Sequence, residues 1–352
     1  MEALRPDFRI ACTGTPVENR LLDLWNLFDT VQPGLLGSAK EFSKKFESNA
    51  KFSQQESSLR DLKTQLLYEK PHAFLVRRLK SDVLELPKKH EHKISCAMSS
   101  IEIEKHQELA FDIGANAKTK SKLDFLHQFA RLYQHPLLLE GNTDESSVEI
   151  LKTSSSKLRK VLEVLRDIQA KGEKTIVFAR HKDVQRMLAR VFTAEFGKPV
   201  RVINGDTPRA TSLRKAGMET RKRSLEEFAK TDGFQVIVLS PFVAGVGLTI
   251  VEANHVIHYG RWWNPAVEAQ ATDRVYRIGQ PREVHVYLPI LEAPTSQLSK
   301  TFDQLLDNLI ERKKKLAEGI LNKDNFLMPQ EQEEQAALEV IIDLEKANTS
   351  FQ

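Results

Sequence analysis

The chain has 352 residues, of which 41% are hydrophobic and 28% are charged, and its formal net charge is +4. At about 150 residues per domain, this length predicts about two domains with a buried core and exposed helical additions. The small net charge excludes little, because a nucleic-acid-binding protein needs a local basic stripe rather than a high total. The cysteines, Cys12 and Cys96, lack the spacing of a disulfide framework or a zinc site, and the ten histidines form no metal-ligand set.

The sequence carries no membrane or export signal that we can identify. Its first residues, MEALRPDFRI, lack the apolar run of a signal peptide. No stretch approaches the roughly 18 apolar residues of a membrane span. We therefore expect a soluble protein without a membrane partner, cytoplasmic in a bacterium or nuclear in a eukaryote.

The first segment, to about residue 47, predicts one strand and one helix. RIACTGTP is a short apolar run that ends in a Gly/Pro turn, as strands do. NRLLDLWNLFDTV has apolar residues at helical spacing, and Pro33 and Gly34 end the expected helix.

The next segment, residues 46–156, is mostly polar and helical in pattern. FLVRRLKSDVLELPKKHEHKI is strongly basic and is interrupted by Pro87. Its basic clusters at 74–80 and 88–93 fit either a DNA contact or a solvated surface. Residues 101–139 predict helices, and the Ser-rich residues 141–156 are a candidate linker.

From Lys157 onward, strands alternate with helices. The expected strands are KTIVF, PVRVI, FQVIVLS, HVIHY and VHVYLPI. This alternation predicts an α/β fold, a parallel sheet flanked by helices on both faces, with ligands at the carboxyl ends of the strands. From Thr295 the pattern is charged and helical, which predicts a C-terminal helical extension.

The most informative stretch is GRWWNPAVEAQATDRVYRIGQPREV. Gln270, Arg274 and Arg277 are spaced four and three apart, so a helix over 265–278 would present all three on one face. Two guanidinium groups together suit a polyphosphate, because each is permanently charged and can donate parallel hydrogen bonds to phosphate oxygens. The alternative is an exposed helix with an Asp273–Arg277 ion pair, which leaves the rest of the run unexplained.

Two glycines follow the expected strand VIVLS. Gly245 and Gly247 would let backbone N–H groups approach an anion closely, although a plain tight turn has the same signature.

Basic and small residues follow two further strands. Arg180, with His181 and Lys182, falls where a strand gives way to a helix, a suitable place to hold a DNA phosphate or simply a solvated basic turn. Asn204 and Gly205 end the next strand in the same way. The adjacent Trp262 and Trp263 could stack on bases, but packing under a loop is the interpretation we favour.

Eight segments together carry a family resemblance. In chain order they are TGTPVENRLLDLWNLFDTVQPGLLGS, FLVRRLKSDVLELPKK, RLYQHPLLL, SSSKLRKVLEVL, KTIVFAR, VINGDTP, VLSPFVAGVGLTI and EAQATDRVYRIGQ. This ordered set resembles the Swi/Snf family of superfamily-two helicase-like ATPases and covers most of Cys12 to Gln280. The resemblance implies a RecA-like fold with two lobes, ATP in the cleft between them and double-stranded DNA across both.

The resemblance also implies roles for individual residues. Arg274 and Arg277 would be arginine fingers that reach ATP, with Gln270 beside the nucleotide. Gly245 and Gly247 would line the cleft. Residues matching positions near the bound DNA strand are Arg180, Asn204, Gly205 and Thr249, and Thr13 and Gly14 match a motif that couples ATP hydrolysis to DNA movement.

The resemblance divides the chain into four regions. Residues 1–47 would be the tail end of the first RecA-like lobe, and residues 48–150 a helical and basic linking region. Residues 151–294 would form the second lobe, and residues 295–352 the helical extension.

The chain departs from the family pattern in two places. NGDTPRATSLRKAGMETRKR contains extra residues before a helix, where Arg221 takes the place of the arginine that opens that helix. Ala179 and Arg180 stand where the family has Ser-Gln.

The largest departure is the absence of a GxGKT/S phosphate loop and of a DEAH-type carboxylate pair. We therefore expect the carboxy-terminal motor half of a longer DNA translocase, an ATP hydrolase that is inactive as this chain alone. ATP and Mg²⁺ would be bound mainly by the missing first lobe. The expected partners are that lobe, double-stranded DNA and proteins of a remodelling, repair or defence complex. The alternatives are a non-enzymatic DNA-binding scaffold, a strand-separating helicase, or a nuclease-fused motor of bacterial defence.

Overall fold

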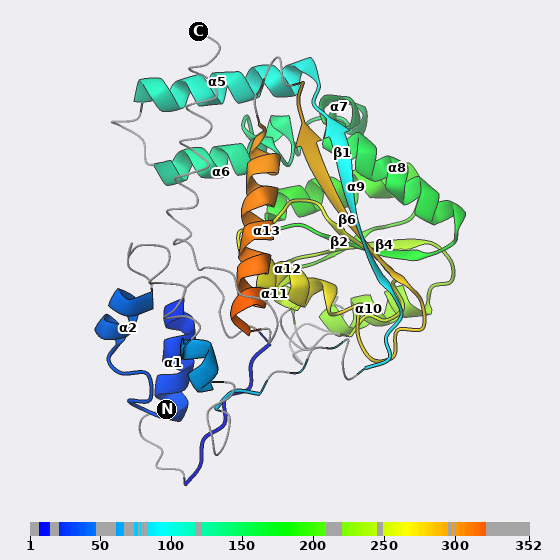
Figure 1. Ribbon diagram of the computed structural model, residues 1–352. Coiled ribbons are helices and arrows are strands. Elements are labelled where there is room, and N and C mark those ends of the chain that lie inside the picture. The colour runs from blue at the N-terminus through cyan, green and yellow to red at the C-terminus, as the bar shows by residue number, and fades with distance from the viewer. Residues whose placement is uncertain are drawn as a thin grey trace. The chain divides into compact units, whose positions relative to one another are not determined.

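Figure 1 shows the computed structural model of the chain. The structure describes residues 7–14, 21–46, 61–66, 74–76, 78, 80, 84–116, 122–141, 143–208, 220–244, 249–294, 298 and 300–321. The chain divides into two compact units. We call them the helical unit (residues 1–83, 263–266 and 308–336) and the sheet unit (residues 84–262, 267–307 and 337–352).

The helical unit contains the amphipathic helix that the sequence predicts. Helix α1 spans Leu21–Val31 and helix α2 spans Ala39–Phe46. The turn after α1 passes through Gly34 at a φ of 84°, a conformation that glycine adopts without strain. One cluster of buried side chains joins these elements: Leu21, Leu24, Phe28, Phe42, Phe46, Leu62 and Leu66.

The predicted strand in RIACTGTP is wrong for its described part. Residues 9–14 have no regular secondary structure, and Ile10 is 74% exposed. A strand is stable only when a neighbouring strand completes its hydrogen bonds. None of the strands in the described part of the chain pairs with this segment.

In the described part of the sheet unit, six parallel strands form one sheet in the order β1-β6-β5-β2-β4-β3. The strands are β1 (Lys89–Ala97), β2 (Lys174–Phe178), β3 (Arg201–Ile203), β4 (Gln235–Leu239), β5 (His255–His258) and β6 (Val284–Glu292). The predicted parallel α/β sheet is therefore confirmed, with all five predicted strands in place.

Strand β1 was not predicted, because its sequence KHEHKISCA is polar and lies in the basic segment. It pairs along its whole length with β6, from Lys89 opposite Val284 to Ala97 opposite Glu292. The rings of His90 and His92 stack on His285 of β6 at centroid distances of 5.1 and 5.4 Å. Cross-strand ring pairs of this kind stabilise a strand whose own sequence carries little apolar signal.

Different helices cover the two faces of the sheet (Figure 1). Along β2, Val177 packs in one cluster with α8 (Ser156–Ala170) and α9 (Lys182–Phe196), as side chains alternate in a strand. Ile176 and Phe178 pack in the opposite cluster with residues of α10 (Arg221–Lys230) and α12 (Pro265–Thr272). Burial on both faces explains why this strand is one continuous apolar run.

The predicted linker at 141–156 is wrong, because the segment folds against the sheet unit's core. It contains helix α7, Val148–Ser154, whose Leu151 is fully buried. Two of its serines are helix caps: Ser147 accepts a hydrogen bond from the Ile150 N–H, and Ser155 accepts one from the Leu158 N–H. Serines favoured at N-caps therefore gave this segment the composition of a linker.

The predicted helices around it are confirmed. They are α5 (Ser100–Asn116), α6 (Lys122–Leu132) and the short 3₁₀ helix η1 (Pro136–Leu138). Helix α11 spans Pro241–Ala244, and α13, Phe302–Leu321, confirms the described part of the C-terminal helical prediction. Among the described residues, no helix has the length and apolarity needed to cross a membrane.

Candidate functional site

Strands β2, β3, β4 and β5 run in parallel, so their carboxyl ends share one edge of the sheet, which we call the carboxyl edge. Main-chain hydrogen bonds hold the first residues beyond this edge. The Ala179 N–H donates to the Leu239 carbonyl at 3.1 Å, and the Ser240 N–H donates to the Ile203 carbonyl at 2.9 Å. The residues that follow the strands therefore start from a rigid frame, as ligand-binding loops of α/β sheets do.

Asn204 lies at this edge, but its side chain is engaged within the chain. Its Nδ2 donates to Gln185 Oε1 at 2.9 Å, and its Oδ1 accepts the Asp206 N–H at 2.9 Å. Gln185 is fully buried and its Nε2 donates to the Ala179 carbonyl at 2.7 Å. This chain of hydrogen bonds ties the end of β3 to the end of β2 and leaves the turn at Gly205 exposed.

Arg221 is the first residue of α10, as the sequence predicted. Its Nε donates to the Thr207 carbonyl at 2.8 Å and its Nη2 donates to the Asn204 carbonyl at 3.3 Å. The guanidinium therefore braces the turn after β3. The extra residues at 209–219 lie outside the described part of the chain.

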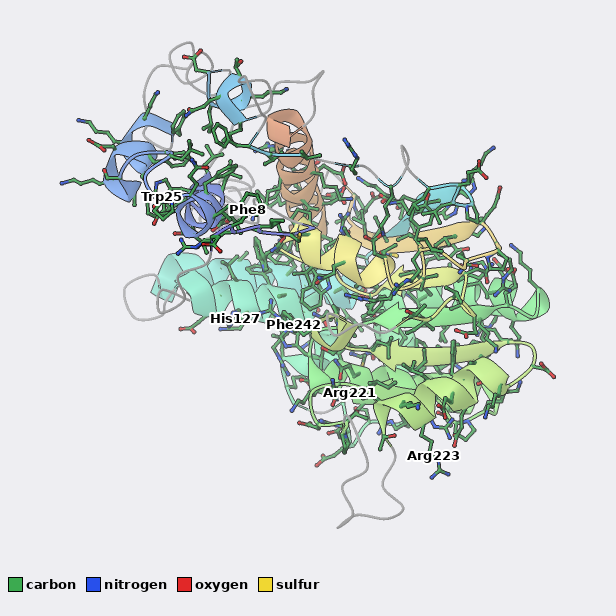
Figure 2. All side chains as sticks on the ribbon, turned by 90° about the horizontal axis from the view of Figure 1, so that it is seen from below. Phe8, Trp25, His127, Arg221, Arg223 and Phe242 are labelled. Carbon is green, nitrogen blue, oxygen red and sulfur yellow. The ribbon has the colours of Figure 1, made fainter. Side chains whose placement is uncertain are left out.

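Arg180 is exposed at the carboxyl edge and lies on an aromatic platform. Its guanidinium carbon is 5.8 Å from the centroid of the Trp262 ring, within cation–π range. Trp262 is 5% exposed, which confirms the packing role favoured from the sequence. The Phe242 ring, labelled in Figure 2, meets Trp262 edge-on at 5.2 Å and 85°.

Phe242 is not among the site residues predicted from the sequence. It is 61% exposed, unusually high for an aromatic side chain beside a buried tryptophan. The available signal was an aromatic residue three positions after a buried strand that ends at the carboxyl edge.

The charged residues that follow Arg180 in the chain form ion pairs, whereas His181 is uncharged. Lys182 pairs with Asp206 at 2.7 Å, and Asp183 pairs with Arg131 at 2.8 Å. His181 stands at the N-cap of α9 without a side-chain capping bond. Burial, followed by the charge of Arg180, lowers the pKa of His181, so this histidine is neutral near pH 7.

The predicted helix over 265–278 is only partly correct. Helix α12 begins after Asn264, whose Oδ1 accepts the Ala266 N–H at 2.9 Å, but it ends at Thr272. Gln270 is exposed on it, whereas Arg274 and Arg277 lie in the tight turns that follow. The single helical face expected for all three side chains is therefore not formed.

Local hydrogen bonds explain why α12 stops at Thr272. The Arg274 N–H donates to the Ala271 carbonyl, three residues back, at 3.2 Å, and the Arg274 carbonyl accepts the Ile250 N–H at 3.0 Å. The buried Gln280 Nε2 donates to the carbonyls of Val251, at 3.1 Å, and Ala253, at 2.8 Å. The Arg274 carbonyl, which a longer helix would use, is thus bonded to another segment, and Gln280 ties the residues after the arginine turns to that segment, which fixes these turns in place.

Arg274 and Arg277 are both half-buried, and neither forms an ion pair with any residue that the structure describes. The Nε of Arg274 is buried without a hydrogen-bond partner among those residues. Burial, then the charge of Arg277, holds the pKa of Arg274 below its ordinary value, and Asp273 acts in the opposite direction. Two neighbouring cations that lack an internal anion are suited to an external one, such as a polyphosphate.

Arg261 is a different kind of arginine. Its side chain is 1% exposed, and its Nε and Nη2 donate to the two carboxylate oxygens of Glu268 at 3.0 and 3.1 Å. Its Nη1 also pairs with Asp307, which Lys93 contacts at 2.7 Å. We call Arg261, Glu268 and Asp307 the buried network. It fastens α12, which leads into the arginine turns, to α13.

The remaining predicted site residues are spread over the molecule. Thr249 is exposed in the sheet unit, and Thr13 and Gly14 are exposed in the helical unit. Gly245 and Gly247 lie outside the described residues. Within the described part of the chain, no group of three or more His, Cys, Asp or Glu side chains is arranged to hold a metal ion.

Comparison with known proteins identifies relatives over nearly the whole chain. A model of the SNF2-related domain matches residues 1–174, and a model of the helicase conserved C-terminal domain matches residues 156–279. The Zorya protein ZorD of Escherichia coli O139:H28 (strain E24377A / ETEC) is 35% identical over 91% of this chain and 29% of its own length. The putative ATP-dependent helicase/translocase YwqA of Bacillus subtilis (strain 168) is 35% identical over 90% of this chain and 33% of its own length. The chain thus spans about a third of these curated relatives.

Solved structures show the same likeness. The Sulfolobus solfataricus SWI2/SNF2 ATPase core in complex with dsDNA has a TM-score of 0.54 and 25% identity, covering 95% of this chain and 65% of that chain. The C-terminal part of the Fun30 ATPase domain has a TM-score of 0.55 at 17% identity, covering 74% of this chain and 99% of that chain. These likenesses confirm the RecA-like fold class that the sequence predicted.

Proposed function

Because this chain belongs to the Swi/Snf family of helicase-like ATPases, we propose that it is the second half of an ATP-driven translocase on double-stranded DNA. In this proposal residues 1–47 complete the ATP-binding lobe. Residues 151–294, with β1 added to their sheet, form the second lobe, and residues 48–150 and 295–352 supply the linking region and the helical extension. The ordered motifs and the family likeness support the assignment.

The observation that carries the proposal is the pair of half-buried guanidinium groups of Arg274 and Arg277, which have no anionic partner among the described residues. They donate hydrogen bonds to the terminal phosphates of ATP and stabilise the charge that develops as the phosphoryl group transfers. Gln270 lies near the nucleotide. A scaffold that binds no nucleotide would gain nothing from leaving these cations unpaired.

ATP and Mg²⁺ are held mainly by the other lobe. The 352 residues contain no GxGKT/S phosphate loop and no DEAH-type carboxylate pair. This chain alone therefore hydrolyses little or no ATP, because its arginines act only on a nucleotide that another lobe positions. For Gly245 and Gly247, which lie outside the described residues, a role beside the nucleotide is supported by the family resemblance alone.

DNA lies along the carboxyl edge of the sheet. Arg180 and the exposed turn at Gly205 contact the strand through its phosphates, and Asn204 holds that turn in shape. Thr249 contacts the same strand, and Thr13 and Gly14 couple hydrolysis to its movement. Other proteins of a remodelling, repair or defence complex are further partners.

The test is ATP hydrolysis by the complete protein, with the ATP-binding lobe present, in the presence of duplex DNA. Arg274→Ala and Arg277→Ala should each lower kcat by about a thousandfold or more, as loss of an arginine finger does. Arg223→Ala is the matched control, because Arg223 is an exposed arginine of the same unit paired only at the surface with Glu227 (Figure 2). Retained DNA-stimulated activity in both finger variants would refute the proposal, and so would rapid hydrolysis by the 352-residue chain alone.

A further inference from the structure

Phe242 presents an apolar ring to solvent at the carboxyl edge, where the exposed Arg180 also lies. It follows β4 by three residues and is 61% exposed. Its ring lies edge-on to Trp262 at 5.2 Å, so Trp262 supports one side of it. An aromatic ring held on one side and open on the other is a contact surface rather than part of the core.

The same tryptophan supports a cation. The Arg180 guanidinium lies over the Trp262 ring at 5.8 Å. Trp262 itself is buried and therefore serves as a fixed base for both side chains. One exposed guanidinium and one exposed ring thus contact the same buried residue.

We propose that Phe242 packs against a deoxyribose or base of the DNA strand whose phosphate Arg180 contacts. This proposal rests on the DNA-binding function proposed above. A nucleotide carries an anionic phosphate next to an apolar sugar edge and an aromatic base, so it satisfies the guanidinium and the ring together. Apolar side chains that contact DNA in this way are found in proteins that bind or deform the duplex.

The proposal separates two kinds of contact that respond differently to salt. A phosphate contact by Arg180 releases a counterion, so its loss makes the dependence of log K on log salt concentration shallower by about one unit. A ring that packs on a sugar or base releases none. Loss of the Phe242 ring should therefore weaken binding equally at all salt concentrations.

The experiment titrates fluorescent duplex DNA with the complete protein over a series of KCl concentrations. Phe242→Ala should weaken binding about tenfold without changing the salt slope, since aromatic contacts to nucleotides contribute about that much. Phe242→Tyr should bind as the wild type does, and Arg180→Ala should lower both the affinity and the slope. Phe111→Ala is the matched control, because Phe111 is an exposed phenylalanine on α5, 69% accessible.

Each other outcome has a distinct meaning. Unchanged binding by Phe242→Ala, with weakened binding by Arg180→Ala, would overturn the inference and leave the DNA function intact. A shallower salt slope in Phe242→Ala would also overturn it, because the ring would then act only by positioning Arg180. If Phe242→Ala does not fold, Phe242→Leu takes its place in the test. Phe242→Leu should lose less affinity for DNA than Arg180→Ala, and its dependence of log K on log salt concentration should equal that of the wild type. Failure of the wild type to bind duplex DNA would instead refute the proposed function.

Discussion

Arg261 and Arg274 lie thirteen positions apart in the chain, and they occupy opposite electrostatic environments. Arg261 is buried against two carboxylates, whereas Arg274 is half-buried beside another arginine and keeps a buried Nε without a partner among the described residues. The first arrangement contributes to the stability of the fold. The second is unfavourable within the chain and becomes favourable only when an anion arrives. The two arginines therefore contrast a charge that the chain pairs with its own carboxylates and a charge that has no ion-pair partner among the described residues.

The largest expected effect on stability is at Arg261. Arg261→Met should lower the free energy of unfolding by about 3–5 kcal/mol, because Glu268 is left buried without its cation. Urea unfolding of the chain, followed by circular dichroism, measures this loss. Adding Glu268→Gln and Asp307→Asn to the same variant should restore part of it. A loss below about 1 kcal/mol would show that the buried network does not hold the fold.

Acid should lower the free energy of unfolding through a buried histidine, while the arginines keep their charge. His106 is 2% exposed, its Nδ1 lies 2.8 Å from the Tyr133 hydroxyl oxygen, and burial lowers its pKa to about 4 from 6.5. The unfolded state therefore binds the proton first as the pH falls. The contribution of the neutral His106 to the free energy of unfolding is fully present above about pH 6.5. About 3 kcal/mol of this free energy is lost between pH 6.5 and pH 4.

Thermal unfolding at a series of pH values tests this expectation. His106→Gln should flatten the pH dependence over that window. The control is His127→Gln, because His127 is an exposed histidine on the neighbouring helix α6 (Figure 2), and it should follow the wild type. Identical pH profiles for the wild type and His106→Gln would contradict the assignment.

The smallest expected effect is at Arg274 and has the opposite sign. Arg274→Met should leave the free energy of unfolding unchanged or raise it by up to about 1 kcal/mol, because it removes the repulsion with Arg277 and a buried Nε that finds no hydrogen-bond partner in the described part of the chain. Differential scanning calorimetry of the chain measures the change. A loss comparable to that of Arg261→Met would show that Arg274 is a structural residue and would end the contrast between the two arginines.

The fold was predictable where burial leaves a strong signal. The strands β2, β4 and β5 are buried on both faces, so their sequences are apolar runs with few alternatives. Strand β1 was missed because its histidines pair with rings on β6, a contact almost two hundred residues away that no local pattern reveals. The serines of 141–156 favoured the wrong prediction of a linker, because helix caps and linker segments are both rich in serine.

For the candidate site, the sequence indicated the arginines but not the backbone that holds them. The arginine pair was identified from its spacing, but the helix expected to hold it stops at Thr272, because the Arg274 carbonyl is bonded to Ile250 in another segment. Phe242 was not identified, because its place after β4 indicates the carboxyl edge but does not show whether the ring is exposed or buried. The roles assigned to the individual site residues stay predictions until the variants above are measured.

The pairing of β1 with β6 has a consequence for how the protein is made. Lys89 of β1 pairs with Val284 of β6, which is synthesised 195 residues later, so β1 can join the sheet only after β6 has been made. At about 5–20 residues per second of synthesis, the histidine-rich strand spends about 10–40 seconds outside the ribosome without its partner. The matched helicase C-terminal region, residues 156–279, includes neither strand. A fragment cut to that region would expose the edge of β5, so a clone beginning near residue 84 and extending through α13 is the better choice for soluble expression.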